Sequence, residues 1–313
     1  MILVTGGAGF IGSHIVEQLL EAGHRVAVLD DLSTGQAANL PHGVPVHVVD
    51  VRDAAAVLRV FGELRPTAVC HQAAQISVSR SVRDVAIDTQ VNVLGTINVL
   101  DAAVRHDCRR VVLASSGGVV YGNVTQPAVE AAIREPVSPY GIAKLTGERY
   151  LQWYTNHYHL QAVALRYANV YGPRQSPHGE AGVVAIFCGR LLAGEPALIH
   201  GTGCQVRDYV HVRDVARANV LALTADLPYG TAYQVNVGTG VGTSVAQLEQ
   251  LVRGHLEAVT GRPLPPPAMG KARPGDLASS LVDASYAYDL LGWRPTVDLP
   301  AGIRETARYF AQT

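Results

Sequence analysis

The sequence predicts an α/β fold, in which a parallel, doubly wound sheet carries helices on both faces and a smaller second domain follows. Short apolar segments alternate along the chain with segments of helical periodicity. The strand-like segments are apolar at nearly every position, which is typical of parallel strands that are covered on both faces. After about residue 168 the chain becomes rich in loop-forming residues, as at 171–177 and 262–267.

Length and composition limit the classes of protein that we consider. The 313 residues correspond to about two domains, and 48% hydrophobic residues provide ample material for a core. The formal net charge of −1 gives no field that attracts nucleic acid or an anionic membrane surface. The sequence has no 18-residue apolar run, no signal-peptide pattern and no CxxC pair among its four cysteines. We expect a cytoplasmic protein with no metal site, no membrane span and no nucleic-acid partner.

The expected strands are short and follow one another through the first half of the chain, at 2–4, 25–30, 46–49, 68–71, 110–114 and 161–165. Segments with apolar residues at i, i+3 and i+4 lie between them, at 12–22, 91–104 and 143–154. We therefore expect residues 1–168 to form the first domain. The apolar segment 233–237 is typical of a strand that returns to the same sheet, so the smaller domain, mostly 169–313, is interleaved with the first.

Three glycines follow the first predicted strand and open the first predicted helix. Gly6 permits a tight turn, Gly9 lets the backbone approach a pyrophosphate, and Gly12 lets the helix pack closely on the strand. Asp30 ends the next predicted strand, 18 residues after Gly12. A carboxylate there accepts hydrogen bonds from a ribose diol and repels a 2′-phosphate. The pattern predicts a Rossmann domain that binds NAD in preference to NADP.

A second group of residues carries the chemistry. Tyr140 and Lys144 are four residues apart on a predicted helix, so both side chains project from one face. A lysine cation and the positive nicotinamide of NAD would lower the phenol pKa from about 10, and each unit of lowering requires about 1.4 kcal/mol. Ser115 and Ser116 follow the strand 110–114, at the sheet edge where α/β folds bind ligands. We expect a serine hydroxyl to share the substrate proton with Tyr140.

Motifs along nearly the whole chain resemble those of the extended short-chain dehydrogenase/reductase family. They are TGGAGFIG (5–12), HQAAQ (71–75), NVLGT (92–96), SSGGVVYG (115–122), SPYGIAK (138–144), RYANVYGPR (166–174) and RDYVHVRDVA (207–216). The resemblance implies a homodimer, a tightly held NAD and a nucleotide-sugar substrate. It also implies that NAD is contacted by Gly6, Gly9, Phe10, Ile11, Gly12, Asp30, Asp31, Asp50, Val51, Ala73, Ala74, Asn92, Tyr140, Lys144 and Tyr167.

Within this family the chain is most similar to the members that invert C4 of a UDP-hexose, interconverting the glucose and galactose forms. Related dehydratases and decarboxylases carry a Glu, often in an Asp-Glu pair, just before the VYG element, where this sequence has Gly117, Gly118 and Val119. Many epimerases place the catalytic Ser or Thr at the position of Gly117. Other members resemble this sequence in having Ser/Thr-Gly-Gly, so Ser116 is our candidate and Ser115 the alternative.

The resemblance also implies which residues bind the substrate. They are Ser116, Asn169, Val183, Arg207, Tyr209, Arg273, Asp276 and Ser280. The arginines suit the diphosphate, Asp276 a ribose, and Asn169 the sugar or diphosphate. Two alternatives stay open: another nucleotide-sugar enzyme of this family (a UDP-GlcNAc or UDP-glucuronate 4-epimerase, less readily a dehydratase), or an NAD-binding sensor or scaffold without catalysis.

Overall fold

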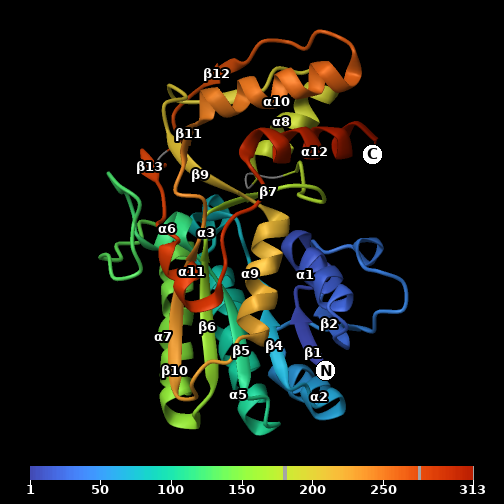
Figure 1. Cartoon of the computed structure of the whole chain (residues 1–313), viewed down its shortest axis with the longest axis vertical. Coiled ribbons are helices and arrows are strands. Elements are labelled where there is room, and N and C mark those ends of the chain that lie inside the picture. The colour runs from blue at the N-terminus through green and yellow to red at the C-terminus, as the bar shows by residue number, and fades with distance from the viewer. Residues whose placement is uncertain (179–181, 274–275, 313) are drawn as a thin grey trace.

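A seven-stranded sheet runs through the larger part of the molecule (Figure 1). The structure is a computed structural model and describes residues 1–178, 182–273 and 276–312. All the strand pairs of this sheet are parallel. In spatial order the strands are β3 (Val46–Val48), β2 (Val26–Asp30), β1 (Ile2–Thr5), β4 (Ala68–His71), β5 (Arg110–Ser116), β6 (Gln161–Tyr167) and β10 (Thr231–Val237). The predicted parallel sheet is confirmed. From β1 the chain adds β2 and β3 on one side of the sheet, and it then adds β4, β5 and β6 on the other side, so the strand order changes direction between β1 and β4.

Helices cover both faces of the sheet because successive residues of each strand point to opposite sides. Val4 packs in one apolar cluster with α1 (Phe10–Glu21) and α9 (Val212–Thr224). Leu3, the residue before it, packs in a second cluster with α2 (Ala54–Leu64), α5 (Gly95–Arg105) and α7 (Pro139–Tyr158). The shorter elements are η1 (Ala37–Asn39), α3 (Val78–Arg83), α4 (Val85–Thr89), the π-helical turn η2 (Gln90–Leu94), α6 (Gly117–Val120) and α11 (Ser285–Leu291).

A smaller part lies beyond the carboxyl ends of the sheet strands, at the top of Figure 1. Its central strand β9 (Val206–His211) pairs with β7 (Asn169–Tyr171), β11 (Gly242–Ser244) and β13 (Ser279–Ser280). A third apolar cluster joins α8 (Val183–Leu192), α10 (Val245–Thr260) and α12 (Leu299–Gln312), and β8 (Leu198–His200) pairs with β12 (Ala268–Gly270). The chain returns from this part to the large sheet as β10, where a strand was expected.

Three helices differ from their predicted bounds, and the first, α1, runs from Phe10 to Glu21 rather than over 12–22. Helix α7 begins at Pro139 rather than 143, since the Ser138 side chain accepts a hydrogen bond from the Gly141 N–H at 3.1 Å and proline suits the first helical turn. It ends at Tyr158, because the next residue, His159, has a left-handed φ of 52°. The helix expected at 91–104 instead continues from α4 through η2 into α5. No helix of the described residues is long and apolar enough to cross a membrane.

Candidate active site

The three glycines lie in the turn after β1 and at the start of α1. This turn packs closely against the loop after β4. Gly6 has a φ of +65°, and a Cβ there would lie 2.6 Å from the Ala73 nitrogen, after β4. A Cβ on Gly12 would lie 2.1 Å from the Gly6 carbonyl oxygen. Neither position accepts a side chain, so the backbone stays open at the N-terminus of α1. Gly9 caps that helix, and Phe10 and Ile11 begin it. This cradle fits the pyrophosphate of a dinucleotide.

Asp30 lies at the carboxyl end of β2, beside the cradle. Its side chain is 6% exposed and accepts hydrogen bonds from the backbone N–H groups of Ala8 and Leu32, each at 2.9 Å. Burial raises the pKa of this carboxyl, and the two backbone hydrogen bonds oppose the rise. Each oxygen keeps a lone pair for a further donor, as binding a ribose diol requires. A Cβ on Gly35 would lie 2.8 Å from the Asp30 Oδ1, so that glycine keeps the space beside the carboxylate open.

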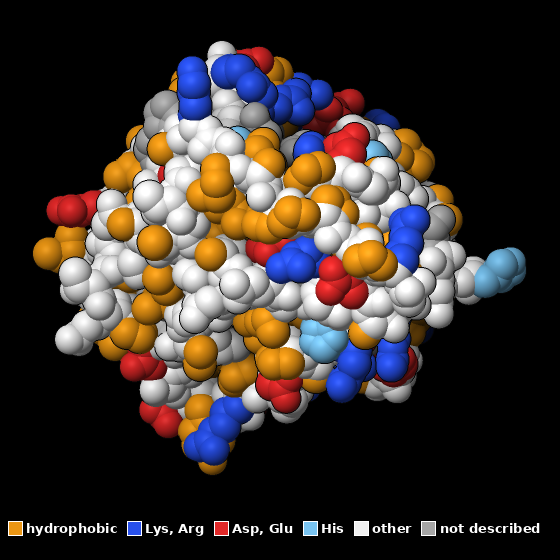
Figure 2. Space-filling model, turned by 90° about the horizontal axis from the view of Figure 1, so that it is seen from above, with side chains coloured by type: hydrophobic (Ala, Val, Ile, Leu, Met, Phe, Trp, Pro, Cys, Tyr) orange, Lys and Arg blue, Asp and Glu red, His pale blue; other side chains and the backbone are white. Residues whose placement is uncertain are grey.

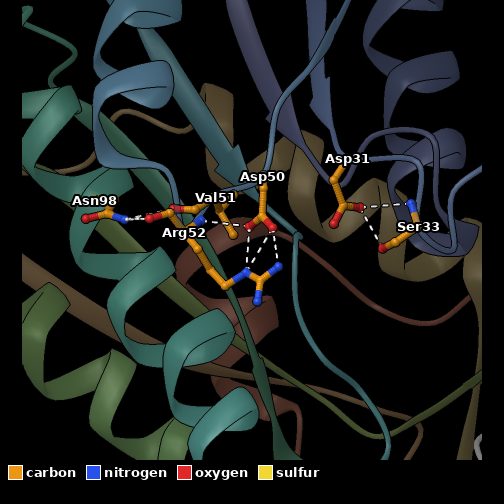
Figure 3. Close-up of polar contacts among 6 residues, drawn as sticks. All are labelled: Asp31, Ser33, Asp50, Val51, Arg52 and Asn98. Atoms are coloured by element: carbon orange, nitrogen blue, oxygen red, sulfur yellow. Dashed lines mark hydrogen bonds and ion pairs between the residues drawn. The ribbon is translucent and has the colours of Figure 1, made fainter.

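The predicted NAD contacts Asp31, Asp50 and Val51 lie in the loops after β2 and β3 (Figure 3). The Arg52 side chain holds the Asp50 carboxylate through Nε at 2.9 Å and Nη2 at 2.5 Å, and these hydrogen bonds lower the Asp50 pKa. Asn98 donates to the carbonyl oxygens of Val51 and Arg52, which ties this loop to α5. Asp31 is exposed and binds Ser33. The loop therefore presents an ordered carboxylate beside the buried Val51 side chain.

The loop after β4 carries the next predicted cofactor residues. Ala73 and Ala74 lie in it, half-buried, and Asn92 fixes it through two hydrogen bonds of 3.0 Å with the backbone of Gln75. Tyr167 lies at the end of β6, and its hydroxyl is held by Gln72 and by Asn219, at 2.9 Å from the Asn219 Oδ1. The Tyr167 hydroxyl thus belongs to a buried network of the chain itself.

Tyr140 and Lys144 lie one turn apart on α7, as the spacing predicts. The Lys144 Nζ donates to the Ala114 carbonyl oxygen at 3.0 Å and lies 5.7 Å from the centroid of the Tyr140 ring. Burial lowers the Lys144 pKa to about 8, and the Asp88 carboxylate opposes this. Burial, aided by Asp88, raises the pKa of the Tyr140 phenol. Burial and the Asp88 carboxylate thus hold the phenol pKa above its usual value, and its expected lowering by Lys144 together with the nicotinamide of NAD stays a prediction.

The two candidate serines point to opposite faces at the end of β5. Ser115 is 3% exposed and donates to the Glu148 Oε1 at 2.5 Å, so its hydroxyl is committed to the interior. Ser116 is half-buried and precedes the glycines that begin α6. A Cβ on Gly117 would lie 2.6 Å from the Val282 Cγ1 and 3.1 Å from the Arg166 carbonyl oxygen. Position 117 therefore has no room for a Ser or Thr unless Val282 moves.

The predicted substrate residues gather on β7, β9 and β13, next to Ser116. A Cβ on Gly118 would lie 3.3 Å from the Asn169 Oδ1 and 3.6 Å from the Ser116 Oγ. The Ser280 hydroxyl donates to the Gly118 carbonyl oxygen at 3.3 Å. Ser280 also pairs with Arg207 in the register of β13 and β9, and Asn169 pairs with Tyr209 in that of β7 and β9. One small area thus holds residues that lie far apart in the sequence.

The remaining predicted contacts lie on the smaller part. The Arg207 Nη2 donates to the Asp276 Oδ1 at 2.5 Å, so the two predicted substrate residues pair with each other. Arg273 is exposed, and Pro274 and Gly275 of the same RPGD segment lie outside the described residues. Val183 begins α8, and the Tyr209 hydroxyl is buried with no hydrogen-bond partner in the described part of the chain. On the face seen from above, basic and acidic side chains are interspersed (Figure 2).

Comparison with known proteins decides the family. The model of the NAD dependent epimerase/dehydratase family matches residues 2–238. The chain belongs to this family. Membership identifies the protein as an enzyme and NAD as its cofactor, in agreement with the glycine cradle and with Asp30.

Relatives of this epimerase/dehydratase chain match it over nearly its whole length. It is 45% identical to a UDP-glucose 4-epimerase of Mycolicibacterium smegmatis, with 98% of this chain and 97% of the relative covered. A Thermotoga maritima UDP-glucose 4-epimerase solved with UDP-glucose is 44% identical, with a TM-score of 0.93 and coverage of 99% and 98%. A Thermus thermophilus UDP-glucose 4-epimerase solved with NAD is 47% identical, with a TM-score of 0.89 and the same coverage.

A further solved relative is named for a different activity. A UDP-N-acetylglucosamine 4-epimerase of Methanobrevibacter ruminantium is 32% identical, with a TM-score of 0.90 and coverage of 99% and 98%. The resemblance to the extended short-chain dehydrogenase/reductase family, inferred from motifs, is confirmed by these comparisons.

Sequence reasoning missed two buried carboxylates near Tyr140 and Lys144: Glu148 on α7 and Asp88 on α4. Glu148 accepts from the Arg166 Nε at 2.9 Å and Nη2 at 2.6 Å, and the Arg166 Nη1 donates to the Tyr121 hydroxyl at 2.7 Å. Asp88 is 1% exposed and lies four residues before Asn92. A usable signal was the spacing of four, because Glu148 follows Lys144, and Asn92 follows Asp88, on the same face of a helix.

Proposed function

We propose that the protein interconverts UDP-glucose and UDP-galactose by inverting C4 of the hexose. The observation that carries the proposal is that α7, the helix of Tyr140 and Lys144, packs against β5 and α6, which carry Ser116, Gly117 and Gly118. These residues supply a proton acceptor for a sugar hydroxyl. The glycines supply no carboxyl group of the kind that eliminating water from the hexose requires. The relatives at 44–47% identity are named as UDP-glucose 4-epimerases, which supports the same reaction.

The cofactor would be held by the first domain, which we assign to residues 1–168 together with β10. Gly6, Gly9 and Gly12 leave space for the pyrophosphate at the N-terminus of α1, and Asp30 accepts from the adenosine ribose. We assign the adenine to Asp50 and Val51. When bound, NAD would accept a hydride from C4 of the hexose and return it to the same carbon. Lys144, whose ammonium group is anchored on the Ala114 carbonyl oxygen, orients the nicotinamide side.

The proton would be handled by side chains on α7 and β5. Tyr140, as phenolate, takes the proton of the C4 hydroxyl and later returns it, and Ser116 hydrogen-bonds the same hydroxyl. Burial raises the phenol pKa, so the phenolate needs cationic neighbours to form near neutral pH. Lys144 is one such neighbour. We propose Ser116 rather than Ser115, since the Ser115 hydroxyl already donates to Glu148.

The nucleotide sugar would be bound by most of residues 169–313. Arg207 and Arg273 hold the diphosphate, because guanidinium groups match phosphate oxygens in geometry and charge. Asp276 accepts from the uridine ribose and Asn169 contacts the sugar. A firm hold on the diphosphate with a roomier hexose pocket allows the keto sugar to rotate and present its other face. Val183 and Tyr209 complete the assignment, the latter on the uridine side.

We propose further that two chains associate through α5 and α7. Large apolar side chains recur on one exposed face of α7, where Ile142 is 54%, Tyr150 38% and Trp153 47% exposed, and Leu94 of η2 is 50% exposed. Paired in a homodimer, these helices would form a four-helix interface. Light scattering at micromolar concentration tests this, and a monomer would contradict it. We also propose that the enzyme is cytoplasmic and acts in carbohydrate metabolism.

A second candidate activity acts on the acetylated sugars UDP-GlcNAc and UDP-GalNAc. The observation that favours it is the small, buried Ser280 side chain beside Gly118, because an aromatic ring at this position would take up space next to the proposed hexose site. The test of both activities is to incubate the protein separately with UDP-glucose, UDP-GlcNAc and UDP-glucuronate and to follow the anomeric protons by NMR. The Tyr140→Phe protein is the matched control. UDP-galactose should form from UDP-glucose with wild type only, and its absence would reject the proposal.

A further inference from the structure

Asp88 is a buried carboxylate with one unused oxygen. It lies in α4 with 1% of its surface exposed. Its Oδ1 accepts from the Gln75 Nε2 at 2.8 Å and from the Asn92 Nδ2 at 2.9 Å. Its Oδ2 is buried and has no hydrogen-bond partner among the described residues. A buried, half-satisfied carboxylate is costly to keep, so we asked which group it serves.

The helix that carries Asp88 packs against the helix that carries the reacting side chains. Both α4 and η2 contact α7, the element of Tyr140 and Lys144. The charge of Asp88 acts on both of these side chains. It opposes the lowering of the Lys144 pKa by burial, and it adds to the raised pKa of the Tyr140 phenol.

The other ionisable groups around this pair are neutral, exposed or already paired. His71 on β4 is neutral, since burial, with a smaller effect of Lys144, lowers its pKa to about 3, and burial raises the pKa of Tyr167 on β6. The charged side chains on the elements packed against α7 are Arg80 and Arg83 of α3 and Arg105 of α5, all exposed, Arg110 of β5, bound to Gln161, Arg166 of β6, paired with Glu148, and Asp101 of α5, bound to Tyr154.

We propose that the Asp88 carboxylate is the counter-ion of the Tyr140–Lys144 pair and a positioning residue for the proton transfer. Asp88 does not touch the substrate. It balances the ammonium group of Lys144 across the α4–α7 contact, and its hydrogen bonds with Gln75 and Asn92 hold the loop after β4 in place. The link to proton transfer rests on the proposed function, whereas the electrostatic role does not.

Removing the charge should shift both ionisations in one direction. Without the carboxylate, the Lys144 pKa loses an influence that raises it, and the Tyr140 pKa loses an influence that raises it. Both limbs of the pH profile of kcat should therefore move to lower pH, by about one unit. A role limited to supporting the loop would lower kcat without moving either limb.

The test compares Asp88→Asn with Asp101→Asn in the NAD-loaded protein. Asparagine keeps an oxygen that accepts from Gln75 and Asn92, so the substitution removes mainly the charge. Asp101 is a matched control, because it is also a carboxylate between α7 and a packed helix. It binds Tyr154, about 21 Å along the helix axis from Tyr140. We expect the acid shift in Asp88→Asn only, and unmoved limbs in that variant would overturn the proposal.

A second readout needs no substrate. The phenolate absorbance of each protein is titrated with pH, and that of the same protein carrying Tyr140→Phe is subtracted, which isolates Tyr140. The Tyr140 midpoint should fall by about one unit in Asp88→Asn, and an unchanged or higher midpoint would overturn the proposal even if the enzyme acted on another sugar. Should Asp88→Asn not fold, Asp88→Glu keeps the charge and should leave the midpoint within a few tenths of a unit of wild type. A larger shift would contradict the counter-ion role.

Discussion

The Ser115 hydroxyl donates a hydrogen bond to the Glu148 carboxylate at 2.5 Å, so the hydroxyls of the two adjacent serines have different surroundings. Glu148 also binds the fully buried Arg166 through both of its oxygens. The group locks the end of β5 to α7, the helix that carries Tyr140. Ser116, the next residue, points to the other face and is half-buried.

Replacing the two serines should therefore give different results. Ser116→Ala should lower kcat by about 10²-fold or more, because a partner of the transferred proton is lost. Ser115→Ala should mainly destabilise the fold, by about 1–3 kcal/mol, because the Glu148 carboxylate loses a buried donor. Steady-state kinetics and urea unfolding of both variants measure the difference. Equal kcat losses with equal stability would contradict the assignment.

Tyr140→Phe should abolish most turnover while NAD stays bound. Loss of a general base typically costs about 10²–10⁴-fold in rate. The cofactor cradle lies on α1 and the β4 loop, so the missing hydroxyl leaves it intact. Turnover and the NAD content of the denatured protein are measured on one preparation. A variant with near-wild-type kcat would remove Tyr140 from the mechanism.

The purified protein should carry NAD without its being added. The epimerase cycle regenerates its cofactor, and Asp30 at the end of β2 disfavours the 2′-phosphate of NADP. The nucleotide released by denaturation identifies the ligand. Finding only NADP, or no nucleotide, would be inconsistent with the role given to Asp30.

The side chain at Ser280 should set the size of the sugar that is accepted. The resemblance implies that this position flanks the 2-substituent of the hexose, and an aromatic ring there excludes acetylated sugars. Wild type should interconvert UDP-GlcNAc with UDP-GalNAc as well as UDP-glucose with UDP-galactose. Ser280→Tyr should lower kcat/KM more for the acetylated pair. The extra loss should correspond to roughly 1–3 kcal/mol of transition-state stabilisation. No wild-type activity on UDP-GlcNAc, or equal losses on both pairs, would refute this.

The sequence predicted the parts of this molecule that depend on local pattern. Apolar strands, the glycines after β1 and the four-residue spacing of Tyr140 and Lys144 are all visible in short segments. The start of α7 was also visible, in Ser138 and Pro139, but the helix was predicted to begin four residues late. Asp88 was missed because its burial and its effect on α7 depend on how two helices pack. The room at Gly117 likewise depends on Val282, which is distant in sequence.

The central claim is that a hydride leaves C4 of the hexose and returns to the opposite face, while Tyr140 handles the proton. The most direct measurement uses UDP-glucose that carries deuterium at C4, incubated with the NAD-loaded protein in ordinary water. The account predicts UDP-galactose that keeps the deuterium at C4, because the hydride never exchanges with solvent. UDP-galactose with hydrogen at C4, or no UDP-galactose at all, would contradict it.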